Sequence, residues 1–175
     1  MRKIVSGLFV SLDGVYSDAN DWIGPWFSAE LGQTIGELIG GQDAMLLGRQ
    51  TYSEFAAHWP QQEGEMADTM NGSVKYVVSD SLESAGWQNT TLINGDVAAR
   101  VRELKRLDGK NIGMTGSGTL VSWLLREGLL DELHLFVFPV LIGSGKRLSG
   151  DKLPLALISP RTYPGGVLHL VYGKA

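Results

Sequence analysis

Apolar residues along the chain fall into short continuous runs separated by amphipathic stretches. Runs at residues 3–10, 44–47, 76–78, 112–115 and 133–140 are rich in Val, Ile, Leu and Phe and are too short for helices. Runs of this kind that lack strict alternation of polar and apolar residues are typical of strands buried on both faces, as in parallel sheets. The pattern therefore predicts at least five buried strands.

Four stretches between or after these runs carry apolar residues at helical spacing. We expect helices over residues 27–39, 97–107 and 119–126, where apolar residues recur every three or four positions. A further helix is expected from Thr51 to His58, since Thr51-Tyr52-Ser53-Glu54 fits a capping box. These helices are short and alternate with the predicted strands.

The polar and C-terminal segments complete the expected fold. Residues 61–73 are polar, and we expect irregular structure there; two further strands are predicted near residues 156–159 and 167–172. Strands that alternate with helices before a β-rich tail predict an α/β fold, with a mostly parallel central sheet flanked by helices and an antiparallel C-terminal strand. No linker or repeat divides the chain, so residues 1–175 are expected to form a single domain.

Composition limits the classes of function. A net charge of −4 argues against nonspecific binding to nucleic acid or to anionic membranes. The absence of cysteine removes disulfides, thiolate catalysis and Cys-type metal sites. His58, His134 and His169 lack the spacing of metal ligands, so no metal site is expected. With no leader segment and no long apolar run in the sequence, the expected compartment is the cytoplasm.

Three of the predicted strands run directly into glycine and hydroxyl residues. The turns are Gly48-Arg49-Gln50-Thr51, Ser79-Asp80-Ser81-Leu82 and Gly116-Ser117-Gly118-Thr119-Leu120, and an amphipathic helix is expected to begin at each. Helix N-termini carry free N–H groups and partial positive charge, and glycine lets a phosphate approach the backbone. Three such turns on one edge of a sheet favour nucleotide binding.

Two loop segments also attract attention. The stretch from Ser11 to Pro25 is longer than a connector needs, as lids and binding segments often are; it carries Trp22 and is followed directly by Trp26. The turn Gly143-Ser144-Gly145-Lys146 is similar to the end of a phosphate-binding P-loop. However, Val140 stands where the first glycine belongs, and Arg147 stands in place of Ser or Thr. A P-loop is therefore not predicted.

Taken together, the motifs resemble the dihydrofolate reductase-like family that includes the reductase domain of riboflavin biosynthesis. The matching segments are Gly48-Arg49-Gln50-Thr51-Tyr52, Val78-Ser79, Gly116-Ser117-Gly118-Thr119-Leu120, residues 128–133 and residues 139–145. They occur in the family's order and span almost the whole chain. The resemblance implies the family's fold, a bound NADPH across the strand ends, and reductase activity.

The resemblance also implies roles for individual residues. Gly48, Arg49, Gln50 and Thr51 would hold the pyrophosphate and the adenosine-side phosphate, Ser79 would lie by the ribose 2′-phosphate, and Gly116, Ser117, Gly118, Thr119 and Leu120 would wrap the second phosphate and the nicotinamide ribose. The planar fork of arginine suits a phosphate. A surface salt bridge is the alternative for Arg49. Asp80, beside Ser79, leaves the choice between NADPH and NADH open.

Two carboxylates are candidates for catalysis. Asp13, in a loop similar to the one that lies over the nicotinamide in riboflavin-type reductases, is a candidate to orient a substrate amine or hydroxyl; an Asx turn beside Gly14 is the alternative. Glu30 follows Pro25-Trp26 and occupies the place of the acidic residue that favours protonation of the pteridine in dihydrofolate reductases. A first-turn glutamate is also common because it complements the helix dipole, and this interpretation is favoured.

The expected function is NADPH-dependent reduction of a small pteridine-like or pyrimidine-like heterocycle by hydride transfer. A noncatalytic nucleotide-binding module and a true dihydrofolate reductase are the alternatives. Residues 133–138 and 167–172 form more apolar β surface than four short helices can cover. Related reductases pair through their C-terminal sheets, so a homodimer is expected, with His134 and His169 near the contact.

Overall fold

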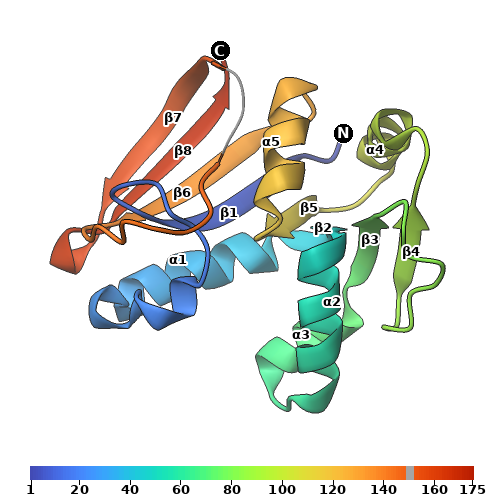
Figure 1. Cartoon of the computed structure of the whole chain (residues 1–175), viewed down its shortest axis with the longest axis horizontal. Helices are drawn as coiled ribbons and strands as arrows, with labels where there is room; N and C mark the ends of the chain where they lie inside the picture. The colour runs from blue at the N-terminus through green and yellow to red at the C-terminus, as the bar shows by residue number, and fades with distance from the viewer. Residues whose placement is uncertain (149–151) are drawn as a thin grey trace.

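A computed structural model of the chain, which describes residues 1–148 and 152–175, contains a mixed eight-stranded sheet (Figure 1). The strands are β1 (Ile4–Ser11), β2 (Gln42–Gly48), β3 (Val74–Val78), β4 (Thr90–Ile93), β5 (Asn111–Thr115), β6 (Glu132–Phe138), β7 (Leu155–Thr162) and β8 (Leu168–Lys174). Their order is β4-β3-β2-β5-β1-β6-β8-β7. Neighbouring strands from β4 to β6 are parallel, whereas β8 is antiparallel to both of its neighbours, β6 and β7. The predicted fold class is confirmed.

In the part of the chain that the structure describes, five α-helices cover the two faces of the sheet. They are α1 (Ala29–Gly40), α2 (Arg49–His58), α3 (Glu65–Gly72), α4 (Val97–Arg106) and α5 (Gly118–Arg126). Residues of α4 and α5 pack in one apolar cluster, while residues of α1 and of the α2 and α3 pair pack in two others. The inner parallel strands β1, β2, β5 and β6 are therefore buried on both sides, as their continuous apolar sequences require.

Alternation along single strands shows how the two layers are divided. In β2, Ala44 and Leu46 belong to the cluster that includes α4 and α5, whereas Met45 and Leu47 pack with α2 and α3. Successive side chains of a strand point to opposite faces, so a four-residue apolar run supplies two contacts to each layer. Gly7 of β1 lies where an added Cβ would be 3.2 Å from Leu38, which lets α1 approach the sheet closely.

Three local expectations were wrong. Residues 61–73 are not irregular throughout, because α3 occupies Glu65–Gly72. No helix begins directly after β3, over residues 79–89. Instead, the hydroxyl of Ser79 accepts hydrogen bonds from the backbone N–H groups of Ser81 and Leu82 and closes a turn. Helix α2 begins at Arg49 with Gly48 as its N-cap, and Thr51 does not cap it.

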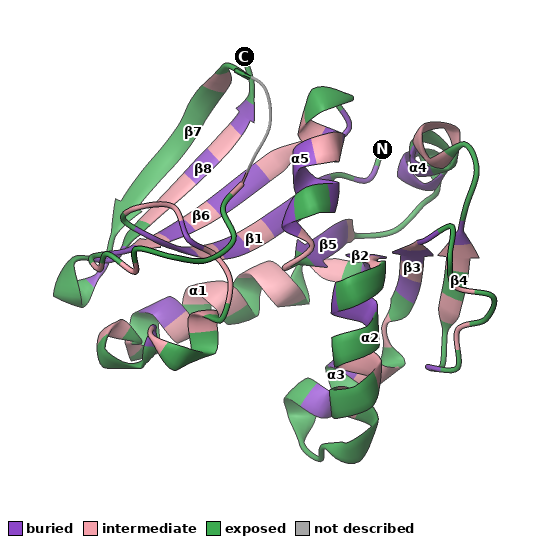
Figure 2. Cartoon of the chain, viewed as in Figure 1, coloured by how far each residue is buried: buried purple, intermediate pink, exposed green. Residues whose placement is uncertain are grey.

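The C-terminal edge of the sheet differs from the rest. Strand β7 is exposed along almost its whole length (Figure 2), with Leu157 52% and Ile158 57% exposed. No helix in the described residues is long and apolar enough to cross a membrane.

Candidate functional site

The loops that follow β1, β2, β5 and β6 meet at the carboxyl end of the parallel strands and enclose a cleft of about 880 Å³. The cleft is lined by Tyr16, Ser17, Asp18, Gly48, Gln50, Thr51, Glu54, Gly116, Ser117, Gly118, Thr119, Leu120, Gly145 and Lys146. In open α/β sheets, ligands bind in crevices at this end of the strands.

A hydroxyl bridge joins the two turns at the floor of the cleft. Ser117 Oγ accepts from the Gly48 N–H at 3.0 Å and donates to Thr51 Oγ1 at 2.9 Å, and the Ser117 N–H donates to the same Thr51 oxygen at 3.1 Å. The three bonds tie the start of α2 to the start of α5 across 66 to 69 residues of sequence. The starts of both helices therefore open into one cleft.

Backbone conformation keeps both helix starts open. Gly116 and Ser117 have positive φ values of 65° and 52°, and Ser117 pays the usual strain of a non-glycine residue there. Neither Gly48 nor Ser117 forms a side-chain cap, so no described side chain takes the first-turn N–H groups of α2 or α5. Free N–H groups and the helix dipole make such ends anion sites.

Tyr16 closes one side of the cleft. An ideal Cβ at Gly118 would lie 2.3 Å from the Tyr16 hydroxyl oxygen, so the ring packs on the start of α5 only because residue 118 is glycine. Tyr16 is half-buried, and burial raises the pKa of its hydroxyl. The hydroxyl is thus a neutral hydrogen-bonding group beside the helix N-terminus.

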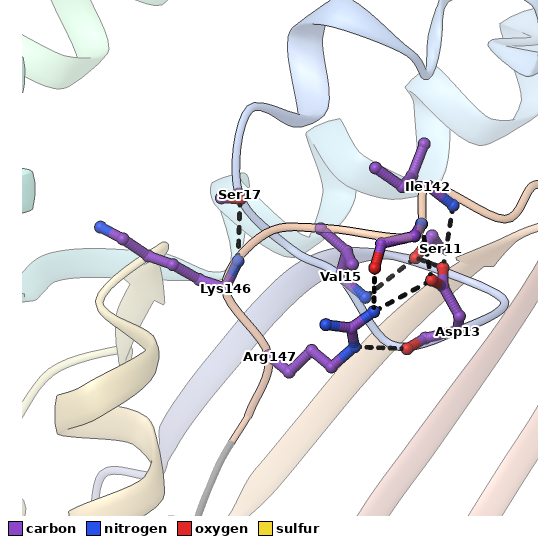
Figure 3. Close-up of polar contacts among 8 residues, drawn as sticks. Ser11, Asp13, Val15, Ser17, Ile142, Lys146 and Arg147 are labelled. Carbon is purple, nitrogen blue, oxygen red and sulfur yellow. Dashed lines mark hydrogen bonds and ion pairs between the residues drawn. The ribbon is translucent and has the colours of Figure 1, made fainter.

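The same side of the cleft is continued by residues 142–147, here called the strap, which lie against the first loop, residues 11–18 (Figure 3). The Tyr16 N–H donates to the Lys146 carbonyl at 2.9 Å, and the Lys146 N–H donates to Ser17 Oγ at 3.1 Å. Lys146 Nζ then reaches Gln50 Oε1 of α2 at 3.1 Å. The strap therefore brings a positive charge to the start of α2.

Asp13 anchors the strap. Its carboxylate accepts from the Ile142 N–H at 3.0 Å and the Gly143 N–H at 2.8 Å, and it pairs with Arg147 at 3.1 Å (Figure 3). Hydrogen bonds from the Ser11 hydroxyl and from those two backbone amides hold the pKa of the Asp13 carboxyl well below its ordinary value. Asp13 is therefore an ionised anchor between two loops. Its carboxylate neither closes an Asx turn nor lies open to a ligand, because its oxygens accept from Ser11 and from residues of the strap.

The structure brings together most of the residues that the sequence assigned to a cofactor. Gly48, Gln50, Thr51, Gly116, Ser117, Gly118, Thr119 and Leu120 all line the cleft. Arg49 and Ser79 are not among the lining residues, although both follow the paired strand ends of Gly48 and Val78 at the same edge. Their assignment to the cofactor remains a prediction.

Arg49 and Glu30 both lie at helix starts with exposed side chains. Arg49 forms no ion pair with any of residues 1–148 or 152–175, which leaves the salt-bridge alternative without a partner in that part of the chain. Glu30 occupies the first turn of α1, whose N-cap is Ser28, and it does not line the cleft. This position is the one that the helix dipole favours, and a catalytic role for Glu30 remains a prediction.

Sequence reasoning missed several lining residues, notably Tyr16, Ser17, Glu54 and Lys146. Two of its observations pointed toward them. The length of the stretch from Ser11 to Pro25, which includes the first loop, is typical of a binding segment, and Gly143-Ser144-Gly145-Lys146 is similar to the end of a P-loop. The latter is no P-loop, since the segment continues to a β-bridge between Val15 and Arg147. Its lysine nevertheless faces the cleft.

A second cavity, of about 530 Å³, lies elsewhere. It is lined by Tyr52, Ala56, Pro60, Asn71, Gly86, Trp87 and Gln88. None of the residues that the sequence assigned to a site lines it. Its main polar groups are already paired, since Trp87 Nε1 donates to Asn71 Oδ1 at 2.8 Å and the Trp87 N–H donates to the Tyr52 hydroxyl at 3.2 Å.

The donor set of the main cleft fits the phosphates of a dinucleotide. Two uncapped helix starts provide N–H groups, and Lys146 provides a cation. Glu54 and Asp18 line the same cleft and carry negative charge. The anion site is therefore confined to the helix starts and Lys146, while the acidic rim suits hydroxyl or amine groups.

The chain is similar to known proteins over most of its length. A family model for the RibD C-terminal domain matches residues 2–168. The Bacillus subtilis protein YyaP is 28% identical over 179 residues, covering 98% of this chain and 94% of YyaP. YwjB of the same organism is 30% identical over 147 residues, covering 82% of this chain and 80% of YwjB.

Solved structures share the fold. A Shewanella protein ascribed to riboflavin biosynthesis superposes with a TM-score of 0.79 at 20% identity, with 99% of both chains covered. A pyrimidine reductase-like protein from Corynebacterium diphtheriae gives 0.67 at 14% identity, covering 98% of this chain and 91% of that one. The Thermotoga maritima diaminohydroxyphosphoribosylaminopyrimidine deaminase/5-amino-6-(5-phosphoribosylamino)uracil reductase gives 0.69 at 14%, covering 99% of this chain and 57% of that one.

The hydroxyl bridge predicts a loss of stability on substitution. Ser117→Ala removes the acceptor of the Gly48 N–H and the donor to Thr51, and should lower the free energy of unfolding by about 1–2 kcal/mol. Urea denaturation measures the change. Ser84→Ala, at an exposed serine, serves as control and should stay within about 0.5 kcal/mol of the parent chain. Equal midpoints for both variants would show that the bridge contributes nothing.

Proposed function

Since this chain belongs to the RibD C-terminal domain family, we propose that it is an NADPH-dependent reductase of a small pyrimidine-like or pteridine-like heterocycle. One observation carries the proposal: two uncapped helix starts, tied together by Ser117, open into the same cleft. A dinucleotide has two linked phosphates that match such a pair of anion sites. Family membership supports an oxidoreductase, and the choice of NADPH is part of the proposal.

The residues of the chain would bind and orient the ligands. The N–H groups at the start of α2, around Gln50 and Thr51, would hold one phosphate, and those around Gly118 and Thr119 would hold the other. Bound NADPH would supply the hydride from its nicotinamide ring. Tyr16 and the strap would exclude water from one side, and the acidic rim would contact polar groups of the substrate.

Two structural neighbours suggest the substrate class. The Corynebacterium neighbour is a pyrimidine reductase-like protein, and the Thermotoga neighbour is an aminouracil reductase joined to a deaminase. We therefore place a pyrimidine first and a pterin such as dihydrofolate second. The cytoplasm is the compartment that we propose for such a reaction.

A noncatalytic nucleotide-binding module is the second candidate, and one observation favours it. Neither carboxylate that the sequence assigned to catalysis is open to the cleft, because Asp13 is bonded to the strap and Glu30 lies on α1 outside the lining. Hydride transfer needs no protein nucleophile, so the reductase remains the first candidate. Substrate-dependent oxidation of NADPH separates the two: a reductase requires it, whereas a module shows only saturable binding.

The first prediction from the proposed function is that NADPH stabilises the folded chain. NADPH at about one hundred times its Kd should add roughly 2.7 kcal/mol to the free energy of unfolding, because it binds only the folded chain. Thermal melts with NADPH and with NADH measure the effect. No shift with either would remove the cofactor from the proposal, and a larger shift with NADH would show that Asp80 disfavours the 2′-phosphate.

The second prediction concerns Arg49. Arg49→Ala should weaken NADPH binding by about tenfold, or roughly 1.4 kcal/mol, and NADH binding by less, if the guanidinium contacts the 2′-phosphate. Titration of protein fluorescence measures both Kd values. Arg102→Ala, at an exposed arginine of α4, is the control and should change neither. Equal weakening for both dinucleotides would place Arg49 at the pyrophosphate, and no weakening would remove it from the site.

We also propose that the chain forms a homodimer through its C-terminal sheet edge. Strand β7 is exposed along its length, and Leu157, Ile158 and Leu168 are 52%, 57% and 37% exposed. An apolar edge strand of this kind favours pairing with another chain. His134 and His169, whose rings are joined by a 2.9 Å Nδ1–Nε2 contact, lie on the neighbouring strands β6 and β8.

Sedimentation equilibrium tests the dimer. The parent chain should sediment at twice the 19.0 kDa of one chain, and Leu157→Asp should shift it toward the monomer because a buried charge at the contact is costly. Leu107→Asp is a matched control, since Leu107 is 50% exposed but lies after α4, away from β7. A single-chain mass for the parent protein would refute the dimer.

A further inference from the structure

All acceptor positions of the Asp13 carboxylate are used within the protein. Oδ1 accepts from the Ser11 hydroxyl at 2.6 Å and the Ile142 N–H at 3.0 Å, and Oδ2 accepts from the Gly143 N–H at 2.8 Å and Arg147 Nη2 at 3.1 Å. An ionised carboxylate offers about four lone-pair sites. No site remains for a substrate amine or hydroxyl unless one of these bonds breaks.

Three of these bonds fix the strap, residues 142–147, at its two ends. Ile142 and Gly143 are held at the beginning, and Arg147, which also donates to the Asp13 carbonyl at 2.9 Å, is held at the end. Between them, Gly145 fits tightly on the first loop: an added Cβ would lie 2.5 Å from Val15 Cγ1. The conformation of the strap is therefore set by Asp13 and by close packing.

The fixed strap carries Lys146 across the mouth of the cleft. Lys146 Nζ donates to Gln50 Oε1 at 3.1 Å, and Gln50 Nε2 donates to Glu54 Oε1 at the same distance. Lys146 is the one lysine or arginine among the described residues that line the cleft. Its ammonium group is exposed and bonded to a neutral amide, so a phosphate at the start of α2 would offer it a stronger partner.

We propose that Asp13 is a positioning residue, which holds the strap so that Lys146 supplies the cleft's cation to a phosphate of the bound dinucleotide. This inference rests on the proposed function, and it assigns a binding role to Lys146 that the motif around it did not predict. Asp13 acts on the ligand only through the strap. The two residues should consequently behave as one unit in binding.

A double-mutant cycle tests this coupling. Lys146→Met should weaken NADPH binding by about tenfold, as loss of a charge-assisted hydrogen bond implies, and Asp13→Asn should weaken it by a similar factor. The double variant should be weakened by little more than either single one, instead of by the product of the two factors. Lys152→Met, at an exposed lysine outside the cleft lining, is the control and should bind like the parent chain.

If the loss of NADPH affinity in the double variant equals the product of the two single losses, the inference is overturned, because Asp13 would then act on the ligand independently of Lys146. Unchanged binding in either single variant would overturn it as well. If Asp13→Asn does not fold, Arg147→Gln provides the second variant, since it removes one anchor and keeps the two amide bonds. Arg147→Gln should also weaken binding, by a smaller factor, and should lose that effect when Lys146 is already Met.

Hydrogen exchange keeps the inference separate from the proposed function. Exchange of the Ile142 and Gly143 amides should be faster in Asp13→Asn than in the parent chain by tenfold or more, without any ligand, because their acceptor is weakened. Unchanged exchange would refute the anchor. If the parent chain bound no NADPH while these amides still depended on Asp13, the proposed function would fail and the anchor would stand without the role of Lys146.

Discussion

The hydroxyl bridge between Ser117, Thr51 and the Gly48 amide is the interaction on which the candidate site depends. The sheet order places β5 beside β2, although 62 residues lie between Gly48, where β2 ends, and Asn111, where β5 begins. Pairing of these strands brings the two turns close, and the bridge then fixes the starts of α2 and α5 relative to each other. Two weak anion sites thereby become one site with two positions, which is what a dinucleotide requires.

The opposite wall of the cleft is built by a different kind of interaction. Backbone hydrogen bonds and the Asp13 carboxylate join the first loop to the strap, which follows β6 far along the chain. The helix starts provide partial positive charge that does not depend on pH, whereas Lys146 provides a full charge on a flexible stem. The cleft therefore combines partial positive charges at the helix starts with the full positive charge of Lys146 on the strap.

Much of the fold and part of the site follow from sequence patterns. The parallel strands β1, β2, β3, β5 and β6 were predictable because burial makes their sequences continuously apolar, whereas the edge strand β4, which begins with Thr90 and Thr91, was not predicted. The two turns that line the cleft were predictable because glycine and hydroxyl residues follow β2 and β5. Helix α3 was not, because its polar residues give little periodicity and its buried contacts come from Ala67 and Met70 alone.

Other features depend on contacts that local sequence does not encode. Thr51 looks like a cap, yet its hydroxyl is used by Ser117, 66 residues away. Ser79 closes a turn with Ser81 and Leu82, so the third strand ends without a helix. The partners of Asp13 on the strap lie 129 to 134 positions further along the chain, and only the assembled sheet brings them together.

The central claim is that a dinucleotide binds at the joined helix starts. The most direct test is a titration of the chain with NADPH in which backbone amide NMR signals are monitored. The account predicts that the largest chemical-shift changes occur at Gln50, Ser117, Gly118 and Lys146, which line that cleft. Changes confined to Gly86 and Trp87, at the second cavity, would contradict it. So would an unchanged spectrum at saturating NADPH.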